Sequence, residues 1–249
     1  MKRGFDFSAA LAGLLVLAPL LALIACAVYL EDRRAPLFFG RRVAGSGRRQ
    51  GHHLFYMVKF RTMIPQAWRT GVSSTAAGDR RVTRVGVLLR RAKLDELPQL
   101  WNVVTGDMSL VGPRPQVEAD AAMYTPEERR MLDVRPGVTD LASIVFADEG
   151  DILAGSADPD LLYNQIIRPW KSRLALLYLE RRTLTSDIRV ILLTLTGAFS
   201  RPAALTAIVK MLTAWEADPE LIRVARRAGQ LQAFPPPGAA EVVQKYQVA

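Results

Sequence analysis

The sequence of 249 residues is poor in the residues that build metal clusters and covalent cross-links. It has one cysteine, Cys26, which excludes both an intrachain disulfide and a cysteine-based metal cluster. His52 and His53 are the only histidines, and this excludes a histidine-rich zinc site. Half of the residues are hydrophobic and 23% are charged, a composition that excludes a disordered chain. The length fits one domain of ordinary size, or one domain with an appendage.

Acidic residues are scarce in one quarter of the chain. From Glu31 to Lys93 there are 15 basic and 3 acidic residues, so this basic stretch carries a charge of +12, against +9 for the whole chain. Such an excess predicts an anionic partner: nucleic acid, anionic lipid or a phosphorylated small molecule. A nucleic-acid-binding protein would explain the basic stretch through phosphate contacts. It would not explain the apolar segment that precedes this stretch, and no recognition motif accompanies the arginines, so we expect no nucleic-acid partner.

The most apolar segment runs from Ala9 to Leu30, 22 residues without a charge. A membrane helix needs about 20 such residues. A secretory signal is one interpretation, with Lys2 and Arg3 as its basic start and a lipoprotein-like box ending at Cys26. The apolar run continues past this cysteine and an arginine-rich block follows at once, and both features disfavour export.

Two membrane arrangements remain for this segment. In a helix that spans the membrane, the arginines after it, such as Arg33 and Arg34, would keep that end in the cytoplasm, and Lys2 would have to be translocated. In a re-entrant helix, Pro19 near the middle bends the chain so that both basic ends stay on the cytoplasmic side. The residues alone favour neither arrangement over the other.

The remaining chain predicts an α+β fold that is mainly helical. Residues 54–60 have the apolar and aromatic content of a short strand. A helix is expected to start at Asp95, where acidic residues suit the first turn, and to end at Gly106. Further helices are expected over residues 171–180 and 185–199, and a modest helix after Arg201. The apolar stripe expected on the helix after Asp95 consists of Leu97, Leu100, Trp101 and Val104.

Asp95 and Glu96 are the candidate chemical groups. On their own they are explained as a solvated acidic pair at a helix start. Their surroundings add a second interpretation, because Arg90, Arg91 and Lys93 directly precede them. Carboxylates beside concentrated cations suit Mg²⁺ together with a phosphorylated ligand. A carboxylate can also attack phosphorus and form an acyl phosphate.

Four strings make the pattern specific, and they occur in the order Lys59-Phe60-Arg61-Thr62-Met63, Leu94-Asp95-Glu96-Leu97-Pro98-Gln99-Leu100-Trp101-Asn102-Val103, Gly106-Asp107-Met108-Ser109-Leu110-Val111-Gly112-Pro113-Arg114-Pro115 and Arg135-Pro136-Gly137-Val138-Thr139. Together with the start Lys2-Arg3-Gly4-Phe5-Asp6, they resemble the bacterial sugar transferase family, the monotopic phosphoglycosyl transferases. The resemblance covers residues 2 to about 200. Long strings in a fixed order make chance similarity an inadequate explanation.

The resemblance implies a reaction and a role for each matching residue. The family transfers a sugar phosphate from a nucleotide diphosphate sugar, usually a UDP-sugar, to undecaprenyl phosphate and releases UMP. Asp95 is then the nucleophile that forms a phosphosugar–enzyme intermediate, and Glu96 helps it to hold Mg²⁺. The substrate-binding cations implied are Lys59, Arg61, Arg90, Arg114 and Arg135. The first glycan-assembly step of this kind occurs at the bacterial inner membrane, with the catalytic domain on the cytoplasmic face.

The resemblance also implies an organisation. Residues 1–34 are expected to form a re-entrant membrane helix broken at Pro19. Residues 35–200 are expected to form a small cytoplasmic catalytic domain with interfacial helices. Residues 201–249 are a C-terminal extension of unknown role. With one long apolar run, we expect a minimal form without further membrane helices. Ala18 stands where many members have serine, and Asp140 where many have glycine. We expect sugar specificity in residues 142–159 and the helices after them. The rival is a membrane-anchored scaffold on the same fold without activity, and the intact Asp95–Glu96 pair argues against it.

Overall fold

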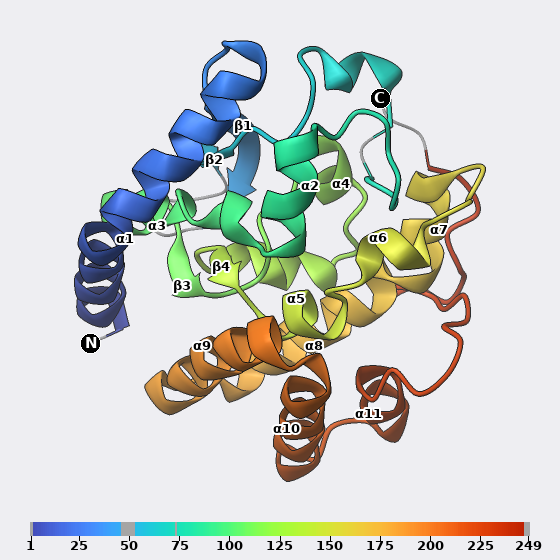
Figure 1. The fold of residues 1–249 in the computed structure, drawn as a ribbon. Coiled ribbons are helices and arrows are strands. Elements are labelled where there is room, and N and C mark those ends of the chain that lie inside the picture. The colour runs from blue at the N-terminus through green and yellow to red at the C-terminus, as the bar shows by residue number, and fades with distance from the viewer. Residues whose placement is uncertain (1, 46–52, 73, 247–249) are drawn as a thin grey trace.

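The structure is a computed structural model that describes residues 2–45, 53–72 and 74–246 (Figure 1). The described residues form a mainly helical fold with two two-stranded sheets, which confirms the expectation of a mainly helical fold with some strands. Arg48 and Arg49 of the basic stretch lie outside the described residues. The elements in chain order are α1 (Lys2–Asp32), β1 (Leu37–Ala44), β2 (His53–Phe60), η1 (Ala67–Thr70), α2 (Arg84–Arg91), η2 (Leu94–Glu96), α3 (Gln99–Thr105), β3 (Ser109–Val111), α4 (Glu118–Ala122), η3 (Glu128–Asp133), β4 (Gly137–Thr139), α5 (Leu141–Val145), α6 (Glu149–Ile152), α7 (Pro159–Ile166), α8 (Arg168–Arg181), α9 (Leu184–Phe199), α10 (Arg201–Ala214) and α11 (Pro219–Ala225).

Helix α1 contains the whole apolar segment, with Pro19 inside it. Among the described residues it is the one helix long and apolar enough to cross a membrane, with a mean hydropathy of 2.7. Figure 1 shows that α1 changes direction along its length. A proline removes one helical hydrogen bond, so a bend in a helix that contains Pro19 has a physical cause. Many apolar side chains of α1, such as Leu15 and Val16, are exposed.

One narrow side of α1 packs on the rest of the protein at two places. Before Pro19, Ala10 packs in a cluster with Val103 of α3. After Pro19, Ile24 and Val28 pack with residues of α2 and β2, among them the buried Phe60. The proline therefore lies between two contacts, and the broad apolar remainder of α1 has no protein cover in the part of the chain that the structure describes.

Strands β1 and β2 form an antiparallel hairpin in which Leu37 pairs with Phe60 and Ala44 with His53. This confirms the strand expected over residues 54–60. Strands β3 and β4 are parallel, and the Arg135-Pro136 segment leads directly into β4. The largest core joins β3 to the C-terminal helices and consists of the buried residues Val111, Leu141, Ala142, Ile144, Val145, Phe146, Leu153, Ile167, Trp170, Leu174, Tyr178, Val190, Ala204, Ile208, Met211, Leu212, Ala217, Leu221, Val224 and Ala225.

The helices expected over residues 171–180 and 185–199 are present as α8 and α9, and the helix after residue 201 as α10. Helices α10 and α11 contribute Ile208, Leu212 and Leu221 to the largest core. The C-terminal region therefore packs against the same hydrophobic interior as α5 and α8.

The expected helix around Asp95 differs from the structure. A 3₁₀ turn holds Asp95, and α3 begins only at Gln99. The expected apolar stripe is wrong at Trp101, which is 56% exposed. The reason is a polar contact: the buried Asn102 side chain accepts from the Val58 N–H at 2.9 Å and turns its own face of α3 toward β2. Gly106 ends the helix in a left-handed conformation, φ 94°, as expected.

Candidate active site

Asp95 lies at a sharp reversal of the chain between α2 and α3. Lys93, just after α2, has a φ of 57°, a left-handed conformation that redirects the backbone. The 3₁₀ turn Leu94–Glu96 follows and buries the Asp95 side chain, leaving the residue 6% exposed. The Leu97 N–H closes this turn on the Leu94 carbonyl at 3.3 Å. The backbone therefore holds Asp95 in a defined, largely dry position.

Three cations from separate elements face this carboxylate. Lys59 comes from β2, Arg90 from the last turn of α2, and Arg114 from the loop after β3. The charges of all three oppose the rise in the pKa of Asp95, so each lies within electrostatic reach of this carboxylate. Arg90 is held in place because its Nε–H donates to the Thr62 hydroxyl at 3.0 Å. The structure thus brings together four of the residues expected in the site.

The loop that carries Arg114 is stiff. Pro113 and Pro115 flank the arginine and fix their own φ angles. The Gly137 N–H donates to the Pro113 carbonyl at 2.9 Å, which ties the loop to β4. A Cβ on Gly137 would lie 2.1 Å from the Gly112 nitrogen, so the two backbones approach this closely only because both residues are glycine.

Glu96 and Arg114 form a two-pronged ion pair. The two Arg114 NH groups lie 2.5 Å from Oε1 and 3.3 Å from Oε2 of Glu96, the fork geometry in which arginine binds carboxylates most strongly. Burial alone would raise the pKa of Glu96, but the charge and hydrogen bonds of Arg114 outweigh it and lower this pKa to about 2. Glu96 is therefore ionised at neutral pH and orients Arg114.

Asp95 and Lys59 have perturbed acidity in opposite directions. Burial raises the pKa of Asp95, and the neighbouring charge of Glu96 raises it further, while the cations oppose both effects. Burial, together with the nearby charges of Arg42 and Arg90, lowers the pKa of Lys59 to about 8. Both groups are thus less stable in their charged forms than they would be in water, and an anionic ligand between them would favour the charged lysine.

Arg42 belongs to the same group of cations, and sequence reasoning placed it only among the basic residues after the apolar segment. Its position on β1 puts it on the same face of the hairpin as Phe38, whose strand partner is Lys59. Burial, together with the charge of Arg114, lowers the pKa of Arg42 to about 10. The period-two alternation of β1 was the signal that could have found Arg42, once the hairpin register was known. We call Asp95, Glu96, Lys59, Arg90, Arg114 and Arg42 the Asp95 cluster.

Two of the expected substrate-binding arginines lie outside the Asp95 cluster. Arg61 makes a two-pronged ion pair with Asp32 at the end of α1, with both N–O distances 2.6 Å. Arg135 donates to the Gly106 carbonyl at 3.1 Å and lines a separate pocket near the start of α1. The structure therefore assigns contacts to both arginines that do not involve Asp95.

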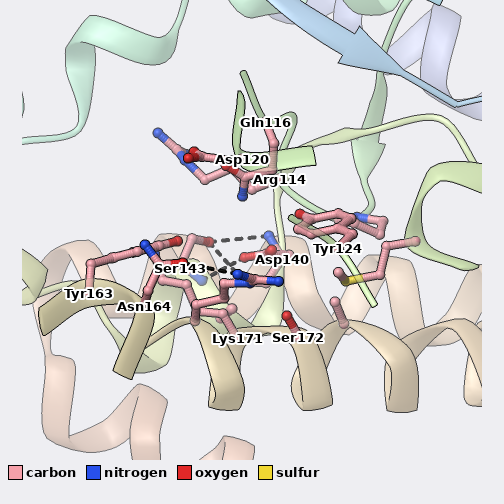
Figure 2. A pocket seen from close by; sticks show the side chains of 15 residues that line it. Arg114, Gln116, Asp120, Tyr124, Asp140, Ser143, Tyr163, Asn164, Lys171 and Ser172 are labelled. Atoms are coloured by element: carbon pink, nitrogen blue, oxygen red, sulfur yellow. Dashed lines mark hydrogen bonds between the residues drawn. The ribbon is translucent and has the colours of Figure 1, made fainter. Parts of the chain in front are cut away.

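A pocket adjoins the Asp95 cluster through Arg114, which is one of its lining residues (Figure 2). Figure 2 shows Arg114 and Asp120 on one side of it, and Tyr163 and Lys171 on the other. The region in which sugar specificity was expected supplies much of the wall. The lining residues are Pro113, Arg114, Gln116, Asp120, Tyr124, Met131, Asp140, Ala142, Ser143, Tyr163, Asn164, Arg168, Lys171, Ser172 and Ala175.

Asp95 and Glu96 are also the residues that fit the expected Mg²⁺. The described residues contain no group of three or more His, Cys, Asp or Glu side chains arranged to hold a metal. Mg²⁺ commonly uses one or two carboxylates and takes its other ligands from substrate phosphates and water. Two adjacent carboxylates among cations that suit phosphate fit this shared mode of binding.

Comparisons with known proteins agree with the geometry. The family model described as bacterial sugar transferase matches residues 1–201. The UDP-glucose:undecaprenyl-phosphate glucose-1-phosphate transferase of Caulobacter vibrioides is 38% identical over 193 residues, which are 75% of this chain and 70% of that protein. The exopolysaccharide production protein PSS of Rhizobium leguminosarum bv. phaseoli is 34% identical over 81% of this chain and 96% of that protein.

Longer relatives match over part of their length. The UDP-N-acetylgalactosamine-undecaprenyl-phosphate N-acetylgalactosaminephosphotransferase of Aeromonas hydrophila is 34% identical over 190 residues, which are 74% of this chain but 44% of that protein. The matched region of this chain includes every member of the Asp95 cluster. The chain belongs to the bacterial sugar transferase family.

Proposed function

We propose that this protein transfers a sugar-1-phosphate from a UDP-sugar to undecaprenyl phosphate and releases UMP, the first membrane step in the assembly of a polysaccharide or glycoconjugate. The observation that carries the proposal is the Asp95 cluster, in which a buried carboxylate is surrounded by an excess of cations. Relatives with this reaction in their names share 34–38% identity with the chain.

The chemistry follows from a nucleophilic carboxylate. One Asp95 oxygen attacks the phosphorus that bears the sugar, an O–P bond forms, and the bond from this phosphorus to the bridging oxygen breaks, so that UMP leaves. A phosphate oxygen of undecaprenyl phosphate then attacks the same phosphorus. The Asp95–phosphorus bond breaks, the free carboxylate is restored, and the product is undecaprenyl diphosphate sugar.

The cations make attack by one anion on another feasible. Lys59, Arg90 and Arg114 neutralise the diphosphate and the charge that develops on the leaving phosphate. Arg42 adds a fourth positive charge from the neighbouring strand. Because these groups come from four rigid elements, little reorganisation accompanies the reaction. Glu96 acts through Arg114, which it holds in a fixed orientation.

Mg²⁺ is the proposed cofactor. Asp95 and Glu96 would hold it together with the donor phosphates, and the ion would neutralise phosphate charge and orient the diphosphate. The protein then supplies the cations and the nucleophile around it. Removing the metal with EDTA should stop UMP release, and adding Mg²⁺ back should restore it.

Helix α1 is proposed to be re-entrant. Its first residues contact the catalytic part of the chain: Lys2 pairs with Asp187 of α9 at 2.5 Å, and Arg3 donates to the last carbonyls of α3. Its last residue, Asp32, pairs with Arg61. A spanning helix would separate its ends by a hydrocarbon layer of about 30 Å. Ends that both bind one domain favour an entry and exit on the same, cytoplasmic face.

Topology is testable with single cysteines in a Cys26→Ser background. Gly4 is exposed and has open space around its Cα, so Gly4→Cys leaves the Lys2–Asp187 pair intact. In intact cells, a maleimide that cannot cross the inner membrane should leave Gly4→Cys unlabelled, and opened vesicles should label it. Gln244→Cys is the matched control for the catalytic side. Efficient labelling of Gly4→Cys from the periplasm would establish a spanning helix.

The function itself is tested with purified protein, Mg²⁺, undecaprenyl phosphate and a panel of UDP-sugars, by following UMP. We expect UMP release with at least one UDP-sugar. Release of a single equivalent of UMP without the lipid, followed by turnover when it is added, would support the two-step course. No UMP from any donor would instead support a scaffold on the same fold.

A further inference from the structure

The C-terminal tail, which lies beyond the region matched by the family model, returns to the pocket beside Arg114. After α11 the chain runs past α7, as the red segment of Figure 1 shows. Its path is fixed by several contacts. The Phe234 N–H donates to the Gln165 carbonyl at 3.0 Å, and the Gln165 side chain donates to the Val243 carbonyl at 2.9 Å. The Phe234 ring also packs on Trp170 at 4.5 Å.

The tail then reaches a residue of the pocket wall. The Tyr246 hydroxyl donates to Oδ1 of Asp120 at 2.8 Å. Asp120 is in α4 and lines the pocket, and Figure 2 shows it beside Arg114. Burial raises the pKa of Asp120, and the hydrogen bond from Tyr246 opposes this effect. Tyr246 thus favours the ionised carboxylate and occupies one of its two oxygens.

We propose that Asp120, positioned by Tyr246, accepts a hydrogen bond from a hydroxyl group of the nucleotide sugar, so that the C-terminal tail is part of the donor site. A carboxylate accepts hydrogen bonds and repels phosphate, so its ligand is a neutral donor group. Arg114 marks the phosphate end of the pocket. The groups on either side of the diphosphate, the transferred sugar and the ribose, both carry hydroxyls. This inference rests on the proposed function.

The test compares Tyr246→Phe with wild type in the UMP-release assay. The change keeps the ring and removes the hydroxyl that holds Asp120. We expect the donor KM to rise about ten-fold, the scale of one charge-assisted hydrogen bond, with kcat within about two-fold. The KM for undecaprenyl phosphate should not change. Gln244→Ala is the matched control, because Gln244 is exposed on the same tail and bonds only to the Val242 carbonyl among its described contacts.

The inhibition constant of UMP shows whether Asp120 binds a hydroxyl of the ribose or of the transferred sugar. If Tyr246→Phe weakens UMP as much as the donor, Asp120 binds the ribose. If UMP inhibition is unchanged and the order of preference among UDP-glucose, UDP-galactose and UDP-N-acetylgalactosamine changes, Asp120 binds the transferred sugar. An unchanged donor KM, or a loss of kcat and thermal stability alone, would overturn the inference. Failure of the proposed function is distinct, because wild type itself would then release no UMP.

Discussion

Two groups of charged side chains differ in how their charges are matched. Arg168 and Glu128 form an ion pair at 2.5 Å in which the arginine also donates to Asn164 and to the Met123 carbonyl, while Ser172 donates to Glu128. The Asp95 cluster has two carboxylates and four cations, with the members Asp95, Glu96, Lys59, Arg90, Arg114 and Arg42.

The difference separates a structural network from a binding site. When a buried charge is paired and hydrogen-bonded, these contacts offset its desolvation penalty. The Arg168–Glu128 pair therefore needs no ligand to balance its charges. Surplus cations repel one another and lose hydration, as the lowered pKa values of Lys59 and Arg42 record. An anionic substrate would relieve both effects. The excess of positive charge is therefore the feature that a donor diphosphate matches.

The largest effect is expected when the nucleophile is removed. Asp95→Asn keeps the shape of the side chain but removes the attacking charge, so UMP release should fall at least about 10³-fold. The fold should not suffer, because burial disfavours the charged Asp95 carboxylate in the wild type. Intact-protein mass after mixing with UDP-sugar, without lipid acceptor, should show an adduct of sugar-phosphate mass on wild type and none on Asp95→Asn.

Glu96→Gln is the matched variant, because it changes the neighbouring carboxylate in the same way. It removes the charge that orients Arg114, so turnover should slow while an adduct still forms when Mg²⁺ is raised. An adduct that persists in Asp95→Asn and vanishes in Glu96→Gln would exchange the two roles. No adduct on wild type, with sequential kinetics, would point to direct attack by the lipid phosphate.

Removing one partner of the Arg168–Glu128 ion pair should lower the stability of the fold and leave the reaction itself unaffected. Glu128→Gln leaves the Arg168 guanidinium buried with an uncompensated charge, and we expect a loss of about 3–5 kcal/mol in the free energy of unfolding. Chemical denaturation measures it. The control is Arg130→Gln, which breaks an exposed pair with Glu180 and should cost no more than about 1 kcal/mol. Equal losses in the two variants would contradict the assigned difference.

The surplus cations predict a pH dependence of activity. With its pKa lowered to about 8, Lys59 is charged below that pH and loses its proton above it, so activity should fall as the pH rises through 8. The raised pKa of Asp95 puts the acidic limb above the range of an ordinary carboxyl group, since Asp95 attacks only when ionised. The profile of kcat/KM should therefore be bell-shaped.

Lys59→Arg tests the assignment of the alkaline limb. A guanidinium keeps its proton to a higher pH than an amine does, so the variant should keep its activity between pH 8 and about 9, below the pKa of about 10 to which Arg42 is lowered, whatever its maximum rate. Lys210→Arg, an exposed position on α10, is the control and should retain the wild-type profile. An alkaline limb that stays near pH 8 in Lys59→Arg would assign it to another group.

Local patterns account for much of what could be predicted. The helix α8, the strongly apolar helix α9 and the strand β2 follow from local pattern and composition. Gly106 ends α3 because glycine readily adopts the left-handed conformation found there. The buried face of α3 could not be predicted from hydrophobicity. Asn102 is polar, and it is buried because its side chain makes two hydrogen bonds to β2.

Contacts between distant segments account for what was missed. Arg42 joins the site through the register of a hairpin, and Tyr246 through a tail that returns over α7. Asp95 and Arg114 lay within strings that the family resemblance covers, so their roles could be proposed from sequence. Arg61 lay in such a string too, and only the structure shows its pairing with Asp32.

Arg61 supplies the smallest and most discriminating test. Its guanidinium holds both oxygens of Asp32 at 2.6 Å and donates to the Ala35 carbonyl at 2.8 Å, so its charge is matched as that of Arg168 is. Arg61→Lys loses the fork, and since the pair is partly exposed we expect a stability loss of about 1 kcal/mol. The donor KM should stay within about two-fold of wild type. Asp32→Asn should cost a similar amount, and the double variant less than the sum, because both changes break one pair. Arg90→Lys, within the Asp95 cluster, should raise the donor KM instead. A raised donor KM in Arg61→Lys without loss of stability would place Arg61 among the substrate-binding cations, as the resemblance implies.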